Sequence, residues 1–397
     1  MALALAGAAK AQDTRELDEL KRRVEELEKR SAPRPASNAF NPDISLILQG
    51  TAARSSQSPN DFQITGFAPS GGEVGPARRG FSLGESELVM SSNIDPYFRG
   101  QLVAAFTPEN EVEVEEAFFQ TLALGKGFTL KGGRFLSGIG YQNPIHQHAW
   151  DFQDAPLPYK AFLGGRLNDD GVQLKWVAPT ELLVELGTEL GRGRTFPATD
   201  PNRNRAGMWS LFGHVGGDVG AATAWRAGLS YLKTSPQDRA FTDAGVVQSF
   251  SGESKLWIAD FVVKSGTNLK LQGEYFRRTE DGDLQFNGAP GDYASRQSGW
   301  YLQSVYQFMP RWRAGYRYDR LSHGTVSAPA GVTAANAPLL LTDHSPNRNT
   351  VMVDWSPTEF SRVRLQLASD KSRVGVTDNQ VLLQYIFSLG AHGAHTF

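Results

Sequence analysis

Two pairs of closely spaced histidines have the spacing of metal ligands. His146 and His148 are separated by one residue, and His392 and His395 are separated by two. Imidazoles at such spacings can share Zn²⁺, but a zinc site needs three or four ligands, and the sequence identifies no others beside either pair. His146 and His148 are therefore candidate metal ligands. The alternative is that they are hydrogen-bonded loop histidines.

A candidate catalytic serine occurs in GFSLG at 80–84, which matches the pattern G-x-S-x-G through Ser82. A serine nucleophile of this kind needs a turn from a strand into a helix. The residues after Ser82 alternate as in a β-strand, and no helical pattern follows them. We therefore expect no enzyme activity. No stretch resembles a phosphate-binding loop or a nucleotide-binding fold, so we also expect no cofactor.

The composition excludes several classes of protein. The 40 lysines and arginines nearly balance the 42 aspartates and glutamates, so the net charge gives no reason to expect nucleic-acid binding. The chain has no cysteine, which excludes disulfides and thiolate metal sites. No window approaches roughly 18 consecutive apolar residues, so no transmembrane helix is predicted. A membrane-spanning β-barrel is compatible with this composition, because it needs only alternate residues to be apolar.

Charged and apolar residues alternate from residue 44 onward, for example in RWRAGYRYD at 311–319 and RVRLQLAS at 362–369. A period of two is typical of β-strands whose two faces differ. The apolar face is rich in aromatic residues on strand after strand, which favours a wall between lipid and water over a soluble sandwich. The charged residues predicted on the inner face are Arg226, Lys270, Arg311, Arg313, Arg317, Arg362 and Arg364 in the C-terminal half, and Glu113, Glu115, Glu185 and Glu189 in the N-terminal half.

Short and long connections also alternate along the chain. Short ones, such as NIDPY at 93–97, are followed by connections that are mostly much longer. Short turns at one end, long loops at the other and an even number of strands are features of outer-membrane barrels. The sheet must close, with its last strand beside its first, because lipid cannot satisfy an open edge. The long connections are placed at 53–79, 137–168, 192–206, 233–252, 278–296 and 321–348. The sixteen strands are placed near 44–52, 80–92, 98–107, 112–123, 128–136, 169–177, 182–191, 207–215, 221–232, 253–263, 268–277, 297–307, 311–320, 349–355, 360–370 and 378–389.

A ring of this size encloses an aqueous lumen. Because arginines crowd one half of the ring and glutamates the other, we expect a field across the water that selects between ions; alternatively, the charges only keep the lumen wet. The connection at 137–168 is apolar and proline-marked, and loops of this length are usually functional. We expect it to fold inward and narrow the pore, with Asp151, Asp154, Asp169 or Asp170 opposite the arginines. The alternatives are an outer lid or a contact between subunits.

The N-terminal residues have a different character. Residues 1–11 are predicted to be the remnant of a signal peptide, since they are apolar and end in a small-x-small motif. At 12–31, leucine and valine repeat at the a and d positions of a coiled coil, which is too short to associate alone and would lock an oligomer fixed elsewhere. The alternative is a single solvated helix. Residues 32–43 are predicted to be an extended linker, and 44–397 the barrel.

The chain resembles sixteen-stranded trimeric outer-membrane porins with a short periplasmic coiled coil, in particular the dicarboxylate-type porins that favour small anions. The resemblance rests on the heptads at 17–27, the pattern of 44–397, the connection at 137–168 and the terminal Phe397. The chain is also similar to proteobacterial proteins labelled zinc-regulated TonB-dependent receptors. That similarity lies in GFSLGESELVMSSNIDPYFRGQL at 80–102, GRFLSGIGYQN at 133–143, HAWDFQD at 148–154 and SLGAHGAHTF at 388–397.

The sequence therefore predicts an all-β protein, a sixteen-stranded antiparallel transmembrane β-barrel with a short N-terminal coiled-coil helix. The resemblance implies a homotrimer in outer-membrane lipid, with the coiled coil in the periplasm. Together with the charged inner face, it predicts passive diffusion of small hydrophilic solutes, preferentially anions. The alternative function is a metal-related uptake receptor that uses His146 and His148.

Overall fold

The structure is a computed structural model of the 397-residue chain. It describes residues 42–71, 74–199, 204–266 and 268–390. The predicted signal peptide at 1–11, the predicted coiled coil at 12–31 and most of the predicted linker at 32–43 lie outside the described residues, as do His392, His395 and Phe397.

The described residues form one antiparallel sheet of eighteen strand segments. The segments are β1 (Asp43–Ser55), β2 (Gly80–Leu83), β3 (Ser86–Asn93), β4 (Phe98–Phe106), β5 (Val112–Thr121), β6 (Phe128–Leu136), β7 (Asn168–Val177), β8 (Leu183–Gly191), β9 (Met208–Val219), β10 (Thr223–Thr234), β11 (Arg239–Asp243), β12 (Val246–Ser265), β13 (Leu269–Phe286), β14 (Ala289–Met309), β15 (Trp312–Ser327), β16 (Asn347–Thr358), β17 (Ser361–Asp370) and β18 (Asp378–Gly390). Both β2 and β3 pair with β1, and both β10 and β11 pair with β12. Each of these two pairs occupies the place of one strand in the ring, so the eighteen segments make a closed ring of sixteen strands.

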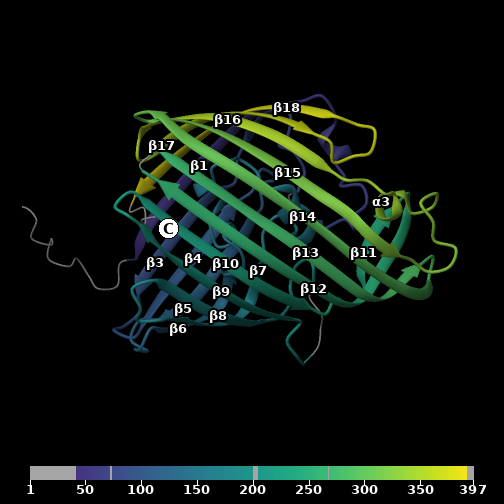
Figure 1. Ribbon diagram of the computed structural model, residues 1–397, viewed down its shortest axis with the longest axis horizontal. Helices are drawn as coiled ribbons and strands as arrows, with labels where there is room; N and C mark the ends of the chain where they lie inside the picture. Colours follow the sequence, from purple (N-terminus) through teal and green to yellow (C-terminus); the bar gives the residue numbers. More distant parts are fainter. Residues whose placement is uncertain (1–41, 72–73, 200–203, 267, 391–397) are drawn as a thin grey trace, which may run out of the picture. The chain divides into compact units, whose positions relative to one another are not determined.

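The sheet closes on itself between its first and last strands. One edge of β1 pairs with β18, from Ser45 opposite Gly390 to Ser55 opposite Gln380, and β1 also pairs with β2 and β3. Figure 1 shows the strands running obliquely around the ring. The predicted number of strands and the predicted pairing of the last strand with the first are therefore confirmed.

The outer face of the ring is apolar, whereas many of the inward side chains are polar. On β14, Trp300, Leu302 and Tyr306 are exposed, and the intervening Tyr301 and Gln303 are buried. Such alternation, repeated around the ring, gives the outer surface that a hydrocarbon environment requires. Within the described parts of the chain, no helix has the length and apolar character needed to cross a bilayer.

Aromatic side chains gather at two levels of the outer face. Near the short turns, Trp312 of β15 and Trp355 of β16 stack with ring centroids 6.0 Å apart. At the second level, Tyr231 lies between Trp209 and Trp257, with centroid separations of 5.5 and 4.8 Å. Membrane barrels carry girdles of aromatic residues at both boundaries between lipid and water. These two clusters are of the kind that such girdles contain.

Two of the predicted long loops are strands instead. The expectation of loops at 233–252 and 278–296 is wrong, because β11 to β14 run through most of both ranges. Asn287 and Gly288 alone join β13 to β14, with φ of 49° and 78°, and Ala244–Gly245 forms the same kind of turn between β11 and β12. Two consecutive residues with positive φ match the twist of the strands they connect, and Asn-Gly is a strong sequence signal for this turn.

Among the residues that the structure describes, four short helices lie in the connections between strands. They are η1 (Pro59–Asp61), η2 (Gln147–Ala149), α2 (Leu157–Leu163) and α3 (Pro338–Leu341). α2 ends at Gly164, whose φ of 68° is left-handed and suits glycine. Asp243 of β11 accepts hydrogen bonds from the backbone N–H groups of Leu339 and Leu340 at 3.0 and 2.9 Å. These bonds hold α3 against the lengthened part of the wall.

Candidate functional site

Residues 137–167, called here the inserted segment, pack against the inward side chains of the ring. Every residue of α2 is buried, and α2 contacts β13, β14 and β15. Phe162 of α2 stacks on Phe276 of β13 with ring centroids 6.2 Å apart, and Leu321 of β15 belongs to the same buried cluster. The apolar composition of the segment therefore has a structural cause, because its side chains supply the core of the barrel interior.

Asn143 holds the two ends of the inserted segment together. Its Nδ2 donates hydrogen bonds to the backbone oxygens of Ser137 and Leu167 at 2.8 and 2.9 Å, and its Oδ1 accepts one from the backbone N–H of Leu167 at 2.7 Å. The side chain is completely buried. Buried donors and acceptors are costly to leave unpaired, so these three bonds close the base of the segment firmly.

A carboxylate of the wall binds the segment at a second point. Glu274 of β13 accepts hydrogen bonds from the backbone N–H groups of Tyr141 and Gln142, each at 3.1 Å. It also accepts hydrogen bonds from the hydroxyls of Tyr159 and Tyr301, at 2.9 and 2.6 Å. Two donors of this set belong to the backbone of the segment, so Glu274 fixes the path of the chain as well as its side chains.

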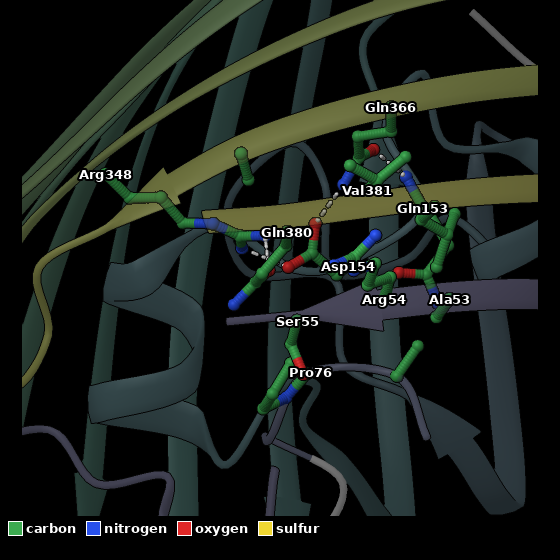
Figure 2. Close-up of a pocket in the computed structure, with 13 residues that line it drawn as sticks. Ala53, Arg54, Ser55, Pro76, Gln153, Asp154, Arg348, Gln366, Gln380 and Val381 are labelled. Carbon is green, nitrogen blue, oxygen red and sulfur yellow. Dashed lines mark hydrogen bonds and ion pairs between the residues drawn. The ribbon is translucent and has the colours of Figure 1, made fainter. Parts of the chain in front are cut away.

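Asp154 anchors the segment on the C-terminal half of the ring, as Figure 2 shows. Its Oδ1 accepts hydrogen bonds from Arg317 at 3.2 Å and from Gln366 at 3.1 Å. Its Oδ2 accepts hydrogen bonds from Lys160 at 3.1 Å and from Arg348. Burial alone would raise the pKa of the Asp154 carboxyl, but Arg348, Lys160 and Arg317 hold it well below its usual range. Asp154 is therefore an ionised group surrounded by buried cations.

Asp151 makes a second acidic anchor, closer to the short turns. Its carboxylate accepts hydrogen bonds from Lys270 of β13 at 2.8 Å and from Arg313 of β15 at 3.0 Å. Arg313 also forms a bidentate pair with Asp354 of β16, at 3.0 and 2.5 Å. Two of the predicted inner residues thus bind the inserted segment directly.

Three further predicted residues also touch the segment. Arg362 and Arg364 of β17 donate hydrogen bonds to the backbone oxygen of Trp150, at 3.3 and 2.7 Å. The guanidinium of Arg226 on β10 lies over the ring of Tyr141, 5.5 Å from its centroid. The basic side chains of the C-terminal half therefore converge on one stretch of the segment.

One predicted inner residue, Arg311, does not lie on a strand. Arg311 lies in the turn between β14 and β15, where it is exposed and has a φ of 70°. Glu113 of β5 pairs with the buried Ala105, and its neighbours Val112 and Val114 are exposed apolar residues, so Glu113 is on the inner side of the ring. Glu185 of β8 is also inward and interacts with His214 at 3.1 Å and Lys175 at 3.0 Å. Alternation misplaced Arg311 because it carried the pattern of β15 into the preceding turn.

Glu189 of β8 holds the first residues of the inserted segment. It accepts hydrogen bonds from the hydroxyl of Ser137 at 2.5 Å and from the backbone N–H of Gly138 at 2.8 Å. Gln173 of β7 and Ser210 of β9 complete its contacts, at 2.8 and 2.6 Å. The carboxylate is buried, so its role is to fix the point where the chain leaves the wall.

The prediction that Asp169 and Asp170 belong to the constricting loop is wrong. Both lie on β7, which begins at Asn168. Asp169 accepts a hydrogen bond from the backbone N–H of Gly193 at 2.6 Å. Asp170 makes a bidentate pair with Arg134 of β6, at 2.6 and 3.0 Å. The prediction failed because β7 starts immediately after the segment. Asp170 stabilises the wall, and Asp169 holds the connection after β8.

The acidic half of the ring binds the segment through two histidines. The Nδ1 of His148 lies 3.0 Å from Oε1 of Glu87, and the Nε2 of His146 lies 3.0 Å from Oε2 of Glu116. An ionised carboxylate only accepts, so each of these nitrogens carries a proton. The Nδ1 of His146 lies 3.3 Å from Oε2 of Glu87 and 3.3 Å from Oε2 of Glu115. The structure thus supplies carboxylates beside the histidines that the sequence could not identify.

A β-bulge places two consecutive glutamates in this cluster. Opposite β4, the register of β5 passes from Glu116 directly to Val114, which leaves Glu115 unpaired. Both glutamates are 5% exposed. Strict alternation would turn one of them outward, whereas a bulge re-aims a side chain. Alternation therefore found Glu115 and missed Glu116, and the break of the pattern at EVEVEEAFF was the available signal.

The charges of the two halves are bridged by the inserted segment. Asp151 and Asp154 pair with cations of the C-terminal half, and His146 and His148 pair with glutamates of the N-terminal half. The arrangement thus differs from two charged walls facing each other across open water, because one segment contacts both.

Half-buried cations remain near the short turns, and we call them the basic lining. Lys270 and Arg313 are 24% and 26% exposed, whereas the carboxylates of Asp151 and Asp354 beside them are 6% and 0% exposed. Water in this part of the interior therefore meets more cationic than anionic surface. The basic lining consists of Arg226, Lys264, Lys270, Arg313 and Arg362.

Comparison with known proteins identifies one relative in sequence and several solved structures with a similar fold. No model of a known protein family matches the chain. An uncharacterized protein of Aquifex aeolicus (strain VF5) is 30% identical over 389 residues, which cover 91% of this chain and 81% of that protein. This identity and coverage are those of members of one family.

Solved structures share the fold at low sequence identity. OmpT of Vibrio cholerae, in its trimer form, has a TM-score of 0.55 at 11% identity, over 88% of this chain and 99% of that one. The outer membrane channel DcaP of Acinetobacter baumannii has a TM-score of 0.54 at 10% identity, over 88% and 97%. An anion-selective porin from Comamonas acidovorans has a TM-score of 0.52 at 9% identity, over 88% and 99%. The chain therefore has the fold of outer-membrane porins and channels.

Proposed function

Because the chain belongs to the same family as the uncharacterized Aquifex aeolicus protein and has the fold of outer-membrane porins and channels, we propose that it is a porin of a bacterial outer membrane. Small hydrophilic solutes diffuse through it passively. The observation that carries the proposal is a closed ring with an apolar outer face and a charged interior, narrowed by the inserted segment. Lipid can surround the apolar outer face of such a ring. The charged interior favours the passage of polar solutes.

Anions are the preferred solutes in this proposal. The basic lining is half-buried and accessible, while the carboxylates of Asp151 and Asp354 are buried beside it. A surface with more accessible positive charge raises the local concentration of anions and lowers the barrier to their passage. The anion selectivity printed for the Comamonas acidovorans porin is consistent with this preference but belongs to that protein.

The assembly in this proposal is a homotrimer in outer-membrane lipid. OmpT of Vibrio cholerae, which has the same fold, is known in a trimer form. Residues 12–31 have the heptad pattern of a coiled coil, which we place in the periplasm. Such a helix adds to an interface that the barrels already make, since two heptads are too short to associate alone.

The alternative of an energised uptake receptor has less support. Outer-membrane transporters of that class have a 22-stranded barrel with a plugged lumen, and the ring here has sixteen strands. The histidines that suggested a metal-related receptor, His146 and His148, bind wall glutamates and hold the inserted segment. Their contacts are compatible with a porin and need no energised transport.

Reconstitution into planar bilayers tests the proposal. Under a salt gradient of KCl, the reversal potential should show preference for chloride, and a trimer should close in three steps. The substitutions Arg226→Gln and Arg362→Gln remove cations of the basic lining. They should move the reversal potential toward the equilibrium potential of potassium. Arg277→Gln is the matched control, because Arg277 is exposed on the outward side of β13. A parent channel that prefers potassium, or an equal effect of the control, contradicts the role of the basic lining.

A further inference from the structure

Three buried atoms of the acidic cluster face one another without hydrogen-bond partners. They are Oε2 of Glu87, Oε2 of Glu115 and Nδ1 of His146. The three atoms lie within 4.8 Å of one another. The side chains of Glu87 and Glu115 are 0% and 6% exposed, so bulk solvent does not reach them. Buried polar atoms are normally paired, and a converging set of unpaired acceptors is the arrangement that a cation would satisfy.

The second polar atom of each of these side chains is already bound. Oε1 of Glu87 interacts with Nδ1 of His148 at 3.0 Å. Oε1 of Glu115 accepts a hydrogen bond from Arg166. Nε2 of His146 donates to Glu116 at 3.0 Å.

These contacts determine which atoms remain for a ligand. A proton on Nε2 of His146 directs the lone pair of the neutral ring to Nδ1, toward the two carboxylates. A carboxylate that receives the other N–H of a ligating histidine is a common feature of metal sites, where it fixes the tautomer and the ring orientation. Glu116 has that position relative to His146.

The separations are suited to a small divalent cation. Nδ1 of His146 is 3.3 Å from each of the two carboxylate oxygens. Metal–ligand distances of about 2.0–2.2 Å in a tetrahedral Zn²⁺ site place neighbouring ligand atoms roughly 3.3–3.6 Å apart. Two carboxylates also balance the charge of one divalent cation.

The ligand types select a class of metal. A nitrogen of imidazole suits zinc and related transition metals, whereas magnesium and calcium prefer sites made only of oxygen. Three protein ligands leave a fourth position, which a water or a solute group can occupy. The β-bulge that re-aims Glu115 toward His146 is a further sign of a built site, since bulges recur beside functional groups.

We propose that Glu87, Glu115 and His146 form a binding site for a divalent transition metal such as Zn²⁺, with Glu116 orienting His146. The metal connects β3 and β5 of the wall to the inserted segment. It therefore fixes the segment on the acidic half of the ring. This inference is independent of the proposed function, because it concerns binding and holds whichever solute the barrel passes.

Calorimetric titration of the full-length protein in detergent tests the site. The protein is stripped with EDTA and titrated with ZnCl₂ at a fixed pH of 8, because metal binding to imidazole depends on pH. We expect one Zn²⁺ per chain, and an excess of MgCl₂ should not displace it. Glu115→Gln, Glu87→Gln and His146→Ala should each remove binding or weaken it at least about tenfold, and Glu116→Gln should weaken it about 10–100-fold. Circular dichroism and heat-dependent gel mobility establish that each variant is folded.

Two control variants separate this site from other histidines. His214→Ala removes a buried histidine that pairs with Glu185 at 3.1 Å, and it should leave the affinity unchanged. The double variant His392→Ala/His395→Ala removes the C-terminal pair and should also bind one Zn²⁺ per chain. A zinc anomalous signal among Glu87, Glu115 and His146 in crystals is the independent structural result expected. The proposal is overturned if the parent binds no zinc, or if binding is lost only in the C-terminal double variant.

Discussion

Asp154 offers the sharpest test of how the inserted segment is held. The substitution Asp154→Asn keeps the size of the side chain and removes its charge. Arg317, Arg348 and Lys160 then lose a shared counter-ion while their side chains remain 0%, 2% and 2% exposed. Breaking one partner out of a buried ion pair typically costs about 3–5 kcal/mol, because the remaining charge has no compensation.

The expected cost is that of about one pair, although three cations are involved. Arg317 keeps a contact with Asp319 at 3.1 Å, and Arg348 keeps one with Asp370 at 3.6 Å. Contacts within one network are not additive, so summing three pairs would exceed the real effect. A loss of about 3 kcal/mol lowers the equilibrium constant for the docked segment by roughly 150-fold, since each 1.4 kcal/mol is a factor of ten.

Single-channel recording measures the consequence. In Asp154→Asn, the segment should leave its docked position for part of the time, which produces larger mean conductance and more open-channel noise than in the parent. Asp170→Asn is the matched control. Its bidentate pair with Arg134 lies on the wall, with side chains 36% and 26% exposed, so its loss should cost about 0–1 kcal/mol. A folded Asp154→Asn channel with parental conductance and noise would refute the anchoring role of Asp154.

Three further predictions concern the other fixed points. Glu274→Gln should destabilise the docked segment by about 1–3 kcal/mol for each buried donor left unpaired, and faster proteolysis within 137–167 checks it. Asn143→Ala should act in the same direction, because it removes three buried hydrogen bonds at the base of the segment, and hydrogen exchange of the Leu167 amide measures the loss. Gly288→Ala should cost about 1–2 kcal/mol of hairpin stability, because φ is 78° there, with denaturant unfolding as the assay and unchanged conductance as its control.

The ring itself was predictable from sequence because its two faces have different solvents. Because lipid lies outside and polar groups lie inside, apolar and polar residues alternate along every strand. Strands such as 98–107 and 360–370 are therefore recognised by pattern alone. β4 and β17 lie within one residue of those ranges. The errors fall where backbone geometry rather than solvent decides. Asn287–Gly288 is a two-residue turn hidden in a polar stretch, and polar composition also suits a loop.

The side-chain contacts of the site were much less predictable. Alternation predicts which face of a strand a residue lies on, but it does not predict which side chain that residue contacts in the interior. Glu115 and His146 are 31 positions apart in the sequence and meet only because the chain turns back through the ring. The bulge that exposes both Glu115 and Glu116 to the interior breaks the rule on which the prediction depends. The inserted segment has no regular periodicity, so alternation could not predict its contacts.

The order of charges along the inserted segment explains its orientation. His146 and His148 come first and meet glutamates of β3 and β5, and Asp151 and Asp154 follow and meet cations of β13, β15 and β16. Turning the segment around would place carboxylates against glutamates and would bury like charges together, which is strongly unfavourable. The uneven charge of the wall therefore selects one direction for the segment. The same charge, where the segment does not cover it near the short turns, remains available to a solute.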